Sequence, residues 1–310
     1  MEQNLPCLHK LVGHATSIVR GFNTSGKERL VIGSLVQMDK HMSCNFFVFP
    51  LFSCYTRFGH SLKRNPSVKT IGLLGGMSWE STVAYYRLIN EGVRERFGGL
   101  HSAKIVLYSV DFHEIEQLQH QGRWDEAGLF LAEAAKQIES AGADFLVLCT
   151  NTMHCVASQI ENHIKIPLLH IADATGEEIK KAGLNTVGLL GTRFTMEQDF
   201  YRGRLTERYD LKVLIPDERE RELIHRVIYE ELCAGKVREN SRDQYVTIIR
   251  GLLDRGAQGV ILGCTEISLL VKAKDVDTKL FDTTAIHAYK AVEWAIQDPG
   301  GGGRGYQANH

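Results

Sequence analysis

The sequence contains no apolar run long enough to cross a membrane, which takes about 20 residues. The best stretch, residues 46–55, is about half that length and is interrupted by Pro50. There is no basic excess either: the net charge is −1, whereas nucleic-acid-binding faces usually carry clustered Lys and Arg. We therefore expect no membrane span and no nucleic-acid partner.

Cysteine is also sparse. The seven cysteines are odd in number and irregularly spaced, which argues against a disulfide framework. Cys149 and Cys155 lie six residues apart with no second close pair, a poor pattern for a metal site. Free thiols in a reducing, cytoplasmic compartment are the plainer interpretation, and we expect no metal.

The two ends of the chain differ from its centre. Residues 1–67 carry eight Lys and Arg but only Glu2, Glu28 and Asp39 as acids. This composition is compatible with an organelle transit peptide. Arg is sparse and helical periodicity is weak, so a poorly ordered extension is favoured over targeting. Residues 297–310 are expected to form a disordered tail.

Two segments of the centre recur at an offset of 115 or 116 residues. Gly72-Leu-Leu-Gly-Gly is followed by Gly188-Leu-Leu-Gly-Thr, and the segment ending in Cys149-Thr150 is followed by one ending in Cys264-Thr265. Such a repeat predicts two similar lobes. We place them at residues 68–180 and 181–296, with the last helix, 284–296, able to pack back on the first.

Short apolar segments alternate with amphipathic ones in both halves. Expected strands are residues 69–74, 103–110, 145–148, 166–171, 186–190, 212–215, 259–262 and 279–281. Expected helices are residues 79–97, 124–141, one beginning near 152, 177–182, 197–208, 218–234, 241–255 and 284–295. Such alternation is typical of parallel sheets covered on both faces. The sequence therefore predicts an α/β protein of two Rossmann-like lobes, related by a pseudo-twofold axis, with the active site between them.

Both Cys-Thr motifs fall where a strand ends and a helix is expected to begin, which is where open α/β folds bind ligands. A helix N-terminus there would lower the pKa of the thiol. Hydroxyl, amide and backbone N–H groups would form a cradle for a carboxylate; the side chains concerned are Thr150, Asn151, Thr152 and Thr265. A single such cysteine is usually a small buried hydrophobe. Two at equivalent positions favour a functional pair.

Opposed thiols with a carboxylate cradle suit racemisation, in which one thiolate removes an α-proton and the other thiol reprotonates the opposite face. No pyridoxal-binding Lys signature is evident, so we expect no cofactor. The first glycine loop lacks the Lys-Ser/Thr of a P-loop, and Met77 and Ser78 are expected to line the cleft. The second loop offers Thr192 and Arg193. His154 could tune Cys149 or be structural, and Cys155 is assigned to packing.

These motifs resemble the aspartate/glutamate racemase family of cofactor-independent amino-acid racemases. The resemblance covers about residues 69–295 and rests on Cys149-Thr-Asn-Thr-Met-His and Gly263-Cys-Thr-Glu. Three segments are particularly similar to the broad-specificity bacterial branch: Lys69-Thr-Ile-Gly-Leu-Leu-Gly-Gly-Met-Ser, Leu148-Cys-Thr-Asn-Thr-Met-His and Gly191-Thr-Arg-Phe-Thr-Met-Glu-Gln-Asp-Phe-Tyr-Arg-Gly-Arg-Leu. It implies that Cys149 and Cys264 are the catalytic bases of an isomerase acting on a small amino acid. It also implies a homodimer, which is common in the family.

One departure affects the substrate. Dedicated aspartate racemases of the family carry a basic residue after the second strand, where this chain reads Ser109-Val-Asp-Phe-His-Glu-Ile. Arg219 and Arg221 follow Ile215-Pro216, but their register is open. A broader substrate range than aspartate and glutamate is plausible. Maleate isomerase and hydantoin racemase remain as alternatives within the superfamily, and a non-catalytic thiol or amino-acid sensor is a minor one.

Overall fold

The structure is a computed structural model that describes residues 17–22, 28–33 and 68–296. The chain divides into two units, residues 1–61 and 62–310. In the first unit, β1 (Ser17–Phe22) pairs antiparallel with β2 (Glu28–Gly33), in a register that sets Ser17 opposite Gly33. No strand was predicted in this range. The expectations of disorder or targeting for residues 1–67, and of a disordered tail at 297–310, otherwise fall outside the described residues.

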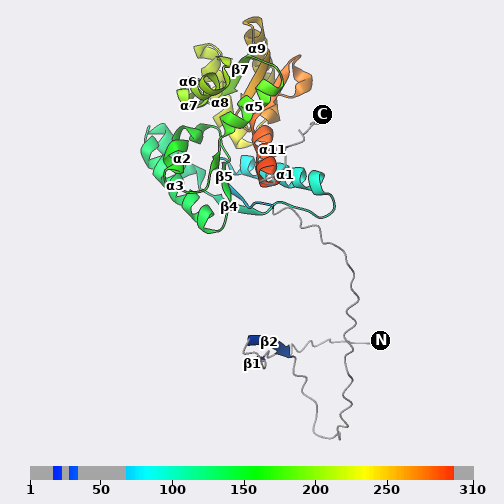
Figure 1. The fold of residues 1–310 in the computed structure, drawn as a ribbon. Helices are drawn as coiled ribbons and strands as arrows, with labels where there is room; N and C mark the ends of the chain where they lie inside the picture. Colours follow the sequence, from blue (N-terminus) through cyan, green and yellow to red (C-terminus); the bar gives the residue numbers. More distant parts are fainter. Residues whose placement is uncertain (1–16, 23–27, 34–67, 297–310) are drawn as a thin grey trace, which may run out of the picture. The chain divides into compact units, whose positions relative to one another are not determined.

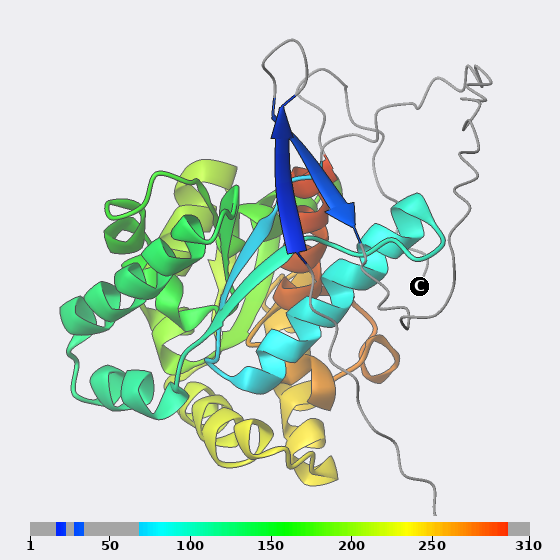
Figure 2. The same ribbon diagram turned by 90° about the horizontal axis from the view of Figure 1, so that it is seen from below.

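The first lobe of the second unit is built on a four-stranded parallel sheet (Figures 1 and 2). Its strand order is β4-β3-β5-β6. The strands are β3 (Ile71–Gly75), β4 (Ile105–Ser109), β5 (Phe145–Leu148) and β6 (Leu168–Leu169). The helices are α1 (Trp79–Phe97), α2 (Phe112–His120), α3 (Trp124–Ser140), the 3-10 helix η1 (Thr152–Val156) and α4 (Ala157–Glu161).

The second lobe repeats this plan with the order β8-β7-β9-β10. Its strands are β7 (Thr186–Gly191), β8 (Lys212–Leu214), β9 (Gly259–Gly263) and β10 (Lys279–Asp282). Its helices are α6 (Arg193–Glu197), α7 (Asp199–Tyr209), α8 (Glu218–Glu230), η2 (Leu232–Ala234), α9 (Glu239–Asp254), α10 (Ile267–Leu270) and η3 (Ala273–Asp275). The predicted α/β fold with two parallel sheets is confirmed.

Every residue of the central strands β3 and β5 is buried, because helices cover both faces of the sheet. One face packs against α3, with Leu131 and Ile138 in the same apolar cluster as Leu146. Gly72 on β3 allows that helix to come close, since an added Cβ would lie 2.4 Å from Ile138 Cγ2. The continuous apolar runs in the sequence thus reflect burial on two sides.

Two helices are exchanged between the lobes. α5 (Ile171–Lys181) follows the first sheet in the chain, yet Ile171 and Ile179 belong to the apolar core of the second sheet. α11 (Thr283–Ile296) follows the second sheet, yet Ala288 and Ala291 lie in a core with Ile71 of the first. The two helices contact each other at the middle of the molecule, and α11 lies along α1 (Figure 1). Each lobe is therefore completed by a helix from the other half.

The boundary between β6 and α5 differs from the prediction. The strand was expected to run to residue 171 and the helix to begin at 177. Instead His170 ends the extended segment, because its Nδ1 accepts the Ala172 N–H at 3.2 Å and so caps the helix. A histidine is an unusual N-cap, which explains why the start of α5 was missed. Within the described ranges, no helix is both long and apolar enough to cross a membrane.

Candidate active site

Cys149 and Cys264 follow two equivalent strands. Cys149 comes directly after β5 and Cys264 directly after β9, and these strands occupy the same position in the two sheets. Cys149 is fully buried, and its N–H donates to Leu74 O on β3 at 2.9 Å. Cys264 is 9 % exposed and lies at the wall of a small cavity. Each lobe thus carries one thiol at the carboxyl end of the equivalent strand.

The cavity lies between the lobes and has a volume of about 30 Å³, room for about two water molecules. From the first lobe it is lined by Met77, Ser78, Phe112, Gln119, Thr150, Asn151 and Thr152. From the second it is lined by Thr192, Ile228, Tyr229, Cys233, Gly263, Cys264, Thr265 and Glu266. Eight predicted residues meet there: Met77, Ser78, Thr150, Asn151, Thr152, Thr192, Cys264 and Thr265. Two are outside the lining: the buried Cys149, and Arg193, which is exposed at the start of α6.

Glu266 joins three lining residues in one network. Ser78 Oγ donates to Glu266 Oε1 at 2.8 Å, while Thr265 Oγ1 and Cys264 Sγ donate to Oε2 at 2.7 Å and 3.0 Å. Glu266 is only 5 % exposed, so these donors replace most of the water that a free carboxylate would bind. Because Ser78 and Glu266 come from different lobes, the network ties the first glycine loop to the second thiol.

The pKa values of both thiols move in the direction opposite to the prediction. Burial raises the pKa of Cys149, and burial together with the adjacent Glu266 carboxylate raises the pKa of Cys264. The expected helix N-termini are weak, since η1 has five residues and α10 has four, too few for a strong dipole. Both thiols are therefore protonated at neutral pH in this arrangement.

Asn151 leaves an unused hydrogen-bond acceptor at the cavity. Its Nδ2 donates to Thr283 Oγ1 at 3.0 Å, and that hydroxyl donates to Leu262 O at 2.9 Å. Since the Thr283 proton is committed to Leu262, the threonine oxygen must accept from the amide, which fixes how the amide is oriented. Asn151 Oδ1 is buried and has no partner among the described residues. A buried acceptor of this kind usually has a hydrogen-bond donor, which a ligand could supply.

A row of hydroxyls also crosses between the lobes. Thr152 Oγ1 lies 3.0 Å from Thr192 Oγ1, which lies 3.1 Å from Thr195 Oγ1. Thr192 also caps α6, because its side chain accepts the Thr195 N–H. The paired glycine-loop and Cys-Thr motifs therefore meet in space, as their placement at strand ends predicted.

Comparison with known proteins identifies the family. The family model for Asp/Glu/hydantoin racemases matches residues 74–291. The chain belongs to this racemase family.

Its relatives match nearly their whole length. The broad-specificity amino-acid racemase RacX of Bacillus subtilis (strain 168) is 24 % identical over 234 residues, which cover 72 % of this chain and 96 % of RacX. The crystal structure of a candidate Asp/Glu racemase from Yersinia pestis is 58 % identical, with a TM-score of 0.70, covering 74 % of this chain and all of that one. An aspartate racemase homologue from Pyrococcus horikoshii OT3 is 38 % identical, with a TM-score of 0.66 and the same coverage.

His154 contacts backbone groups through both of its ring nitrogens. Its Nδ1 lies 2.7 Å from Thr150 O and its Nε2 lies 3.2 Å from the Ile171 N–H. The carbonyl can only accept and the N–H can only donate, so Nδ1 carries the proton and the ring is neutral. Burial lowers its pKa well below the usual value. The ring therefore holds the backbone of Thr150 in place, and no hydrogen bond joins it to Cys149 among those described.

Several residues that line this site were not predicted from the sequence. Glu266 stood inside the Gly263-Cys-Thr-Glu motif, so its position beside Cys264 was a usable signal. Phe112 and Gln119 come from α2, which was not predicted, and Cys233 lies outside the repeat, so no pattern singled it out. Ile228 and Tyr229 lie on a predicted helix whose cavity-facing side the sequence alone does not reveal. No group of three His, Cys, Asp or Glu suited to a metal occurs among the residues the structure describes.

Proposed function

We propose that this protein is an amino-acid racemase that works without pyridoxal phosphate and uses Cys149 and Cys264 as its two bases. The placement of the thiols after β5 and β9, equivalent strands of the two lobes, carries the proposal. Membership of the racemase family supports it, and one relative is named a broad-specificity amino-acid racemase. No lysine lines the cavity in the described part of the chain, so no amine is available there for a Schiff base.

Turnover requires that one of the two thiols first lose its proton. Cys264 has the acceptor for it, since Glu266 Oε2 lies 3.0 Å from its sulfur. The Cys264 thiolate then takes the α-proton from one face of the substrate, breaking Cα–H and forming S–H. The Cys149 thiol gives its proton to the opposite face, which forms the new Cα–H bond and leaves a thiolate. The reverse reaction begins from that Cys149 thiolate.

The ammonium and the α-carboxylate of the substrate are assigned to different groups of the cavity. We assign Asn151 Oδ1 to the substrate ammonium, because it is a buried acceptor without a donor. The hydroxyls of Thr150, Thr152 and Thr192 remain for the α-carboxylate. Thr265 was expected to share that role, but its proton is committed to Glu266, so we assign it to holding Glu266 instead.

The substrate side chain is proposed to be uncharged. The described lining contains no Lys or Arg, and its one carboxylate, Glu266, would repel a second acid. Arg221 is already engaged, since its Nε donates to Glu197 Oε1 at 2.8 Å. Met77, Phe112 and Ile228 supply apolar surface instead. The same lining disfavours maleate, which carries two negative charges.

The proposal is tested by following racemisation without added pyridoxal phosphate. Chiral chromatography would be run on aspartate, glutamate and a panel of neutral amino acids with wild type, Cys149→Ser, Cys264→Ser and Cys155→Ser. We expect turnover of neutral substrates that falls by about 10²- to 10⁴-fold in the first two variants, the usual contribution of a positioned acid or base. Cys155 lies outside the cavity lining, so Cys155→Ser serves as the matched control. Equal activity in all four proteins would contradict the proposal, as would racemisation of none of the amino acids.

A further inference from the structure

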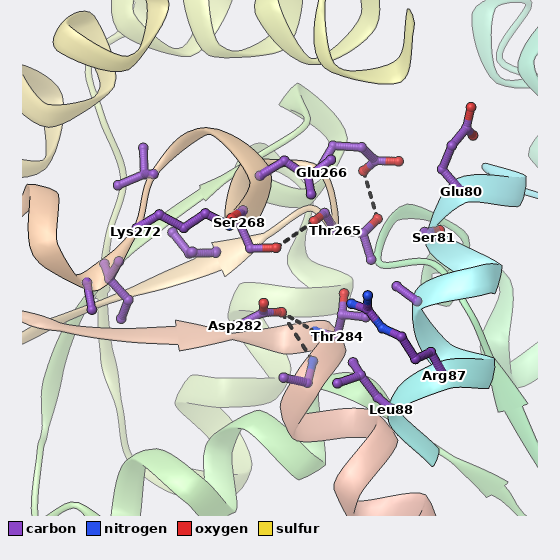
Figure 3. Close-up of a pocket in the computed structure, with 17 residues that line it drawn as sticks. Glu80, Ser81, Arg87, Leu88, Thr265, Glu266, Ser268, Lys272, Asp282 and Thr284 are labelled. Atoms are coloured by element: carbon purple, nitrogen blue, oxygen red, sulfur yellow. Dashed lines mark hydrogen bonds between the residues drawn. The ribbon is translucent and has the colours of Figure 1, made fainter. Parts of the chain in front are cut away.

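A second, larger cavity of about 360 Å³ lies between α1 and the edge of the second lobe (Figure 3). Its walls come from α1, α10, the segment through η3, β10 and the start of α11. It shares two residues, Thr265 and Glu266, with the small cavity at Cys264. The volume is within the range of small-molecule sites, and none of the proposed chemistry uses it.

Three polar groups of this cavity have no hydrogen-bond or ion-pair partner among the described residues. Thr284 is 3 % exposed, and its Oγ1 makes no hydrogen bond to any described residue. Neither Arg87 nor Glu80, both on α1, forms an ion pair or side-chain hydrogen bond with the part of the chain that is described. Figure 3 shows Arg87 extending from α1 toward Thr284 at the start of α11. A buried hydroxyl without a partner is destabilising, and a ligand that bonds to it would remove that penalty.

The lining combines both signs of charge with apolar surface. Glu80, Glu266 and Asp282 are acidic, and Arg87 and Lys272 are basic. The remaining surface is largely aliphatic, from Ala84, Leu88, Leu269, Val271, Ala273, Leu280 and Ala285. Mixed charge favours a zwitterion over a dianion, and the aliphatic walls favour an apolar side chain.

We propose that this cavity binds an α-amino acid with an apolar side chain as a second ligand. Its carboxylate would be held by the Arg87 guanidinium and the Thr284 hydroxyl. Binding at this place does not depend on the catalytic proposal. A consequence of binding does rest on it: because Thr265 and Glu266 form part of both cavities, an occupant changes the racemisation rate.

Binding is measured by calorimetry with α-methyl-L-leucine. This zwitterion has an apolar side chain but no α-hydrogen, so a racemase cannot turn it over. We expect Arg87→Met to weaken its binding at least tenfold, because it removes a charge-assisted hydrogen bond to the carboxylate. Thr284→Val should weaken it severalfold. Leucinamide, which lacks the carboxylate, should not bind. Arg94→Met, an exposed position of the same helix outside this lining, is the matched control and should bind as wild type does.

Equal affinity in wild type, Arg87→Met and Thr284→Val would overturn the second site, and so would the absence of saturable binding. The two proposals fail separately. If the ligand binds in a way that depends on Arg87 but no amino acid is racemised, the second site is supported and the catalytic assignment is wrong. Racemisation by a protein whose ligand binding does not depend on Arg87 would keep the catalytic assignment and overturn the second site. Where both hold, α-methyl-L-leucine should change the racemisation rate of wild type more than that of Arg87→Met, because it can also compete with the substrate at the small cavity in both proteins.

Discussion

Glu266 accepts hydrogen bonds from Cys264, Thr265 and Ser78, and this single carboxylate has two opposed effects on Cys264. Its negative charge raises the pKa of the thiol, which keeps the proton on sulfur. Its proximity also makes it the acceptor through which that proton can leave. A neutral amide at this position would remove both effects at once.

Glu266→Gln should therefore lower the pKa of Cys264 while slowing racemisation by about 10²- to 10³-fold, because the proton acceptor is gone. The pKa is read from the pH dependence of iodoacetamide labelling at Cys264, followed by mass spectrometry. Glu133→Gln is the control, since Glu133 is exposed on α3 and lies in the lining of neither cavity. An unchanged labelling profile in Glu266→Gln would show that its charge does not act on the thiol.

Among single residues, the two active-site thiols could be predicted from the sequence, but the groups around them could not. Cys149 and Cys264 stand out because they recur at one offset, and both lie where the repeat placed them, at strand ends. The lowered thiol pKa values predicted from helix N-termini were wrong, because burial and Glu266 outweigh one or two short helical turns. Arg193 is exposed, since capping by Thr192 turns the chain into α6 and away from the cavity.

Among the elements, α5 determines how the lobes are joined, because it leaves the first sheet and packs on the second. Asp173 on α5 accepts two hydrogen bonds from Arg204 on α7, at 2.7 Å from Nε and 2.6 Å from Nη2. The two side chains are 20 % and 25 % exposed. A bidentate, partly buried pair of this kind is stronger than an ordinary surface ion pair.

Arg204→Met should lower the free energy of unfolding by about 1–2 kcal/mol, as loss of a charge-assisted pair leaves Asp173 partly buried without its main partner. Urea denaturation measures the change. Arg202→Met, which removes the exposed pair with Asp199, should cost less than about 0.5 kcal/mol. Similar losses in the two variants would mean that the α5–α7 contact contributes little.

The boundaries of helices and strands could be predicted where a capping residue or a continuous apolar run marks them. Residues 79–97 and 145–148 match α1 and β5 because Ser78 caps the helix and the strand is a continuous apolar run. α2 was missed because its nine residues bury only Ile115 and Gln119, too few for a clear helical stripe. A return of the last helix to the first lobe had been expected, but the packing of α5 on the second lobe depends on contacts between distant segments, which periodicity does not contain.

For the whole molecule, three buried histidines lie together where the lobes meet. The ring of His154 lies 4.5 Å from that of His170 and 5.8 Å from that of His287. Burial lowers the pKa of His170 to about 2 and of His287 to about 4, and lowers that of His154 as well. All three are neutral in the folded protein at any pH near neutrality.

Stability should therefore fall as the pH is lowered from 7.5 to 5.5. The unfolded chain takes up protons near pH 6.5 while the folded histidines do not, so protonation favours unfolding. The expected loss is about 1.4 kcal/mol for each histidine at pH 5.5, about 4 kcal/mol for the three. His170→Asn, which can still cap α5, should flatten the slope, and the exposed His163→Asn should not. A stability independent of pH over this interval would contradict the neutral cluster.

The central claim, that two thiols act on opposite faces of one substrate, is tested most directly by α-proton exchange in D₂O. Each enantiomer of a neutral substrate would be followed by NMR with Cys149→Ser and with Cys264→Ser. Each variant keeps one working thiol, so we expect it to exchange the α-proton of one enantiomer without inverting it. We expect the two variants to select opposite enantiomers. Exchange of the same enantiomer by both variants, or continued inversion in either, would contradict it.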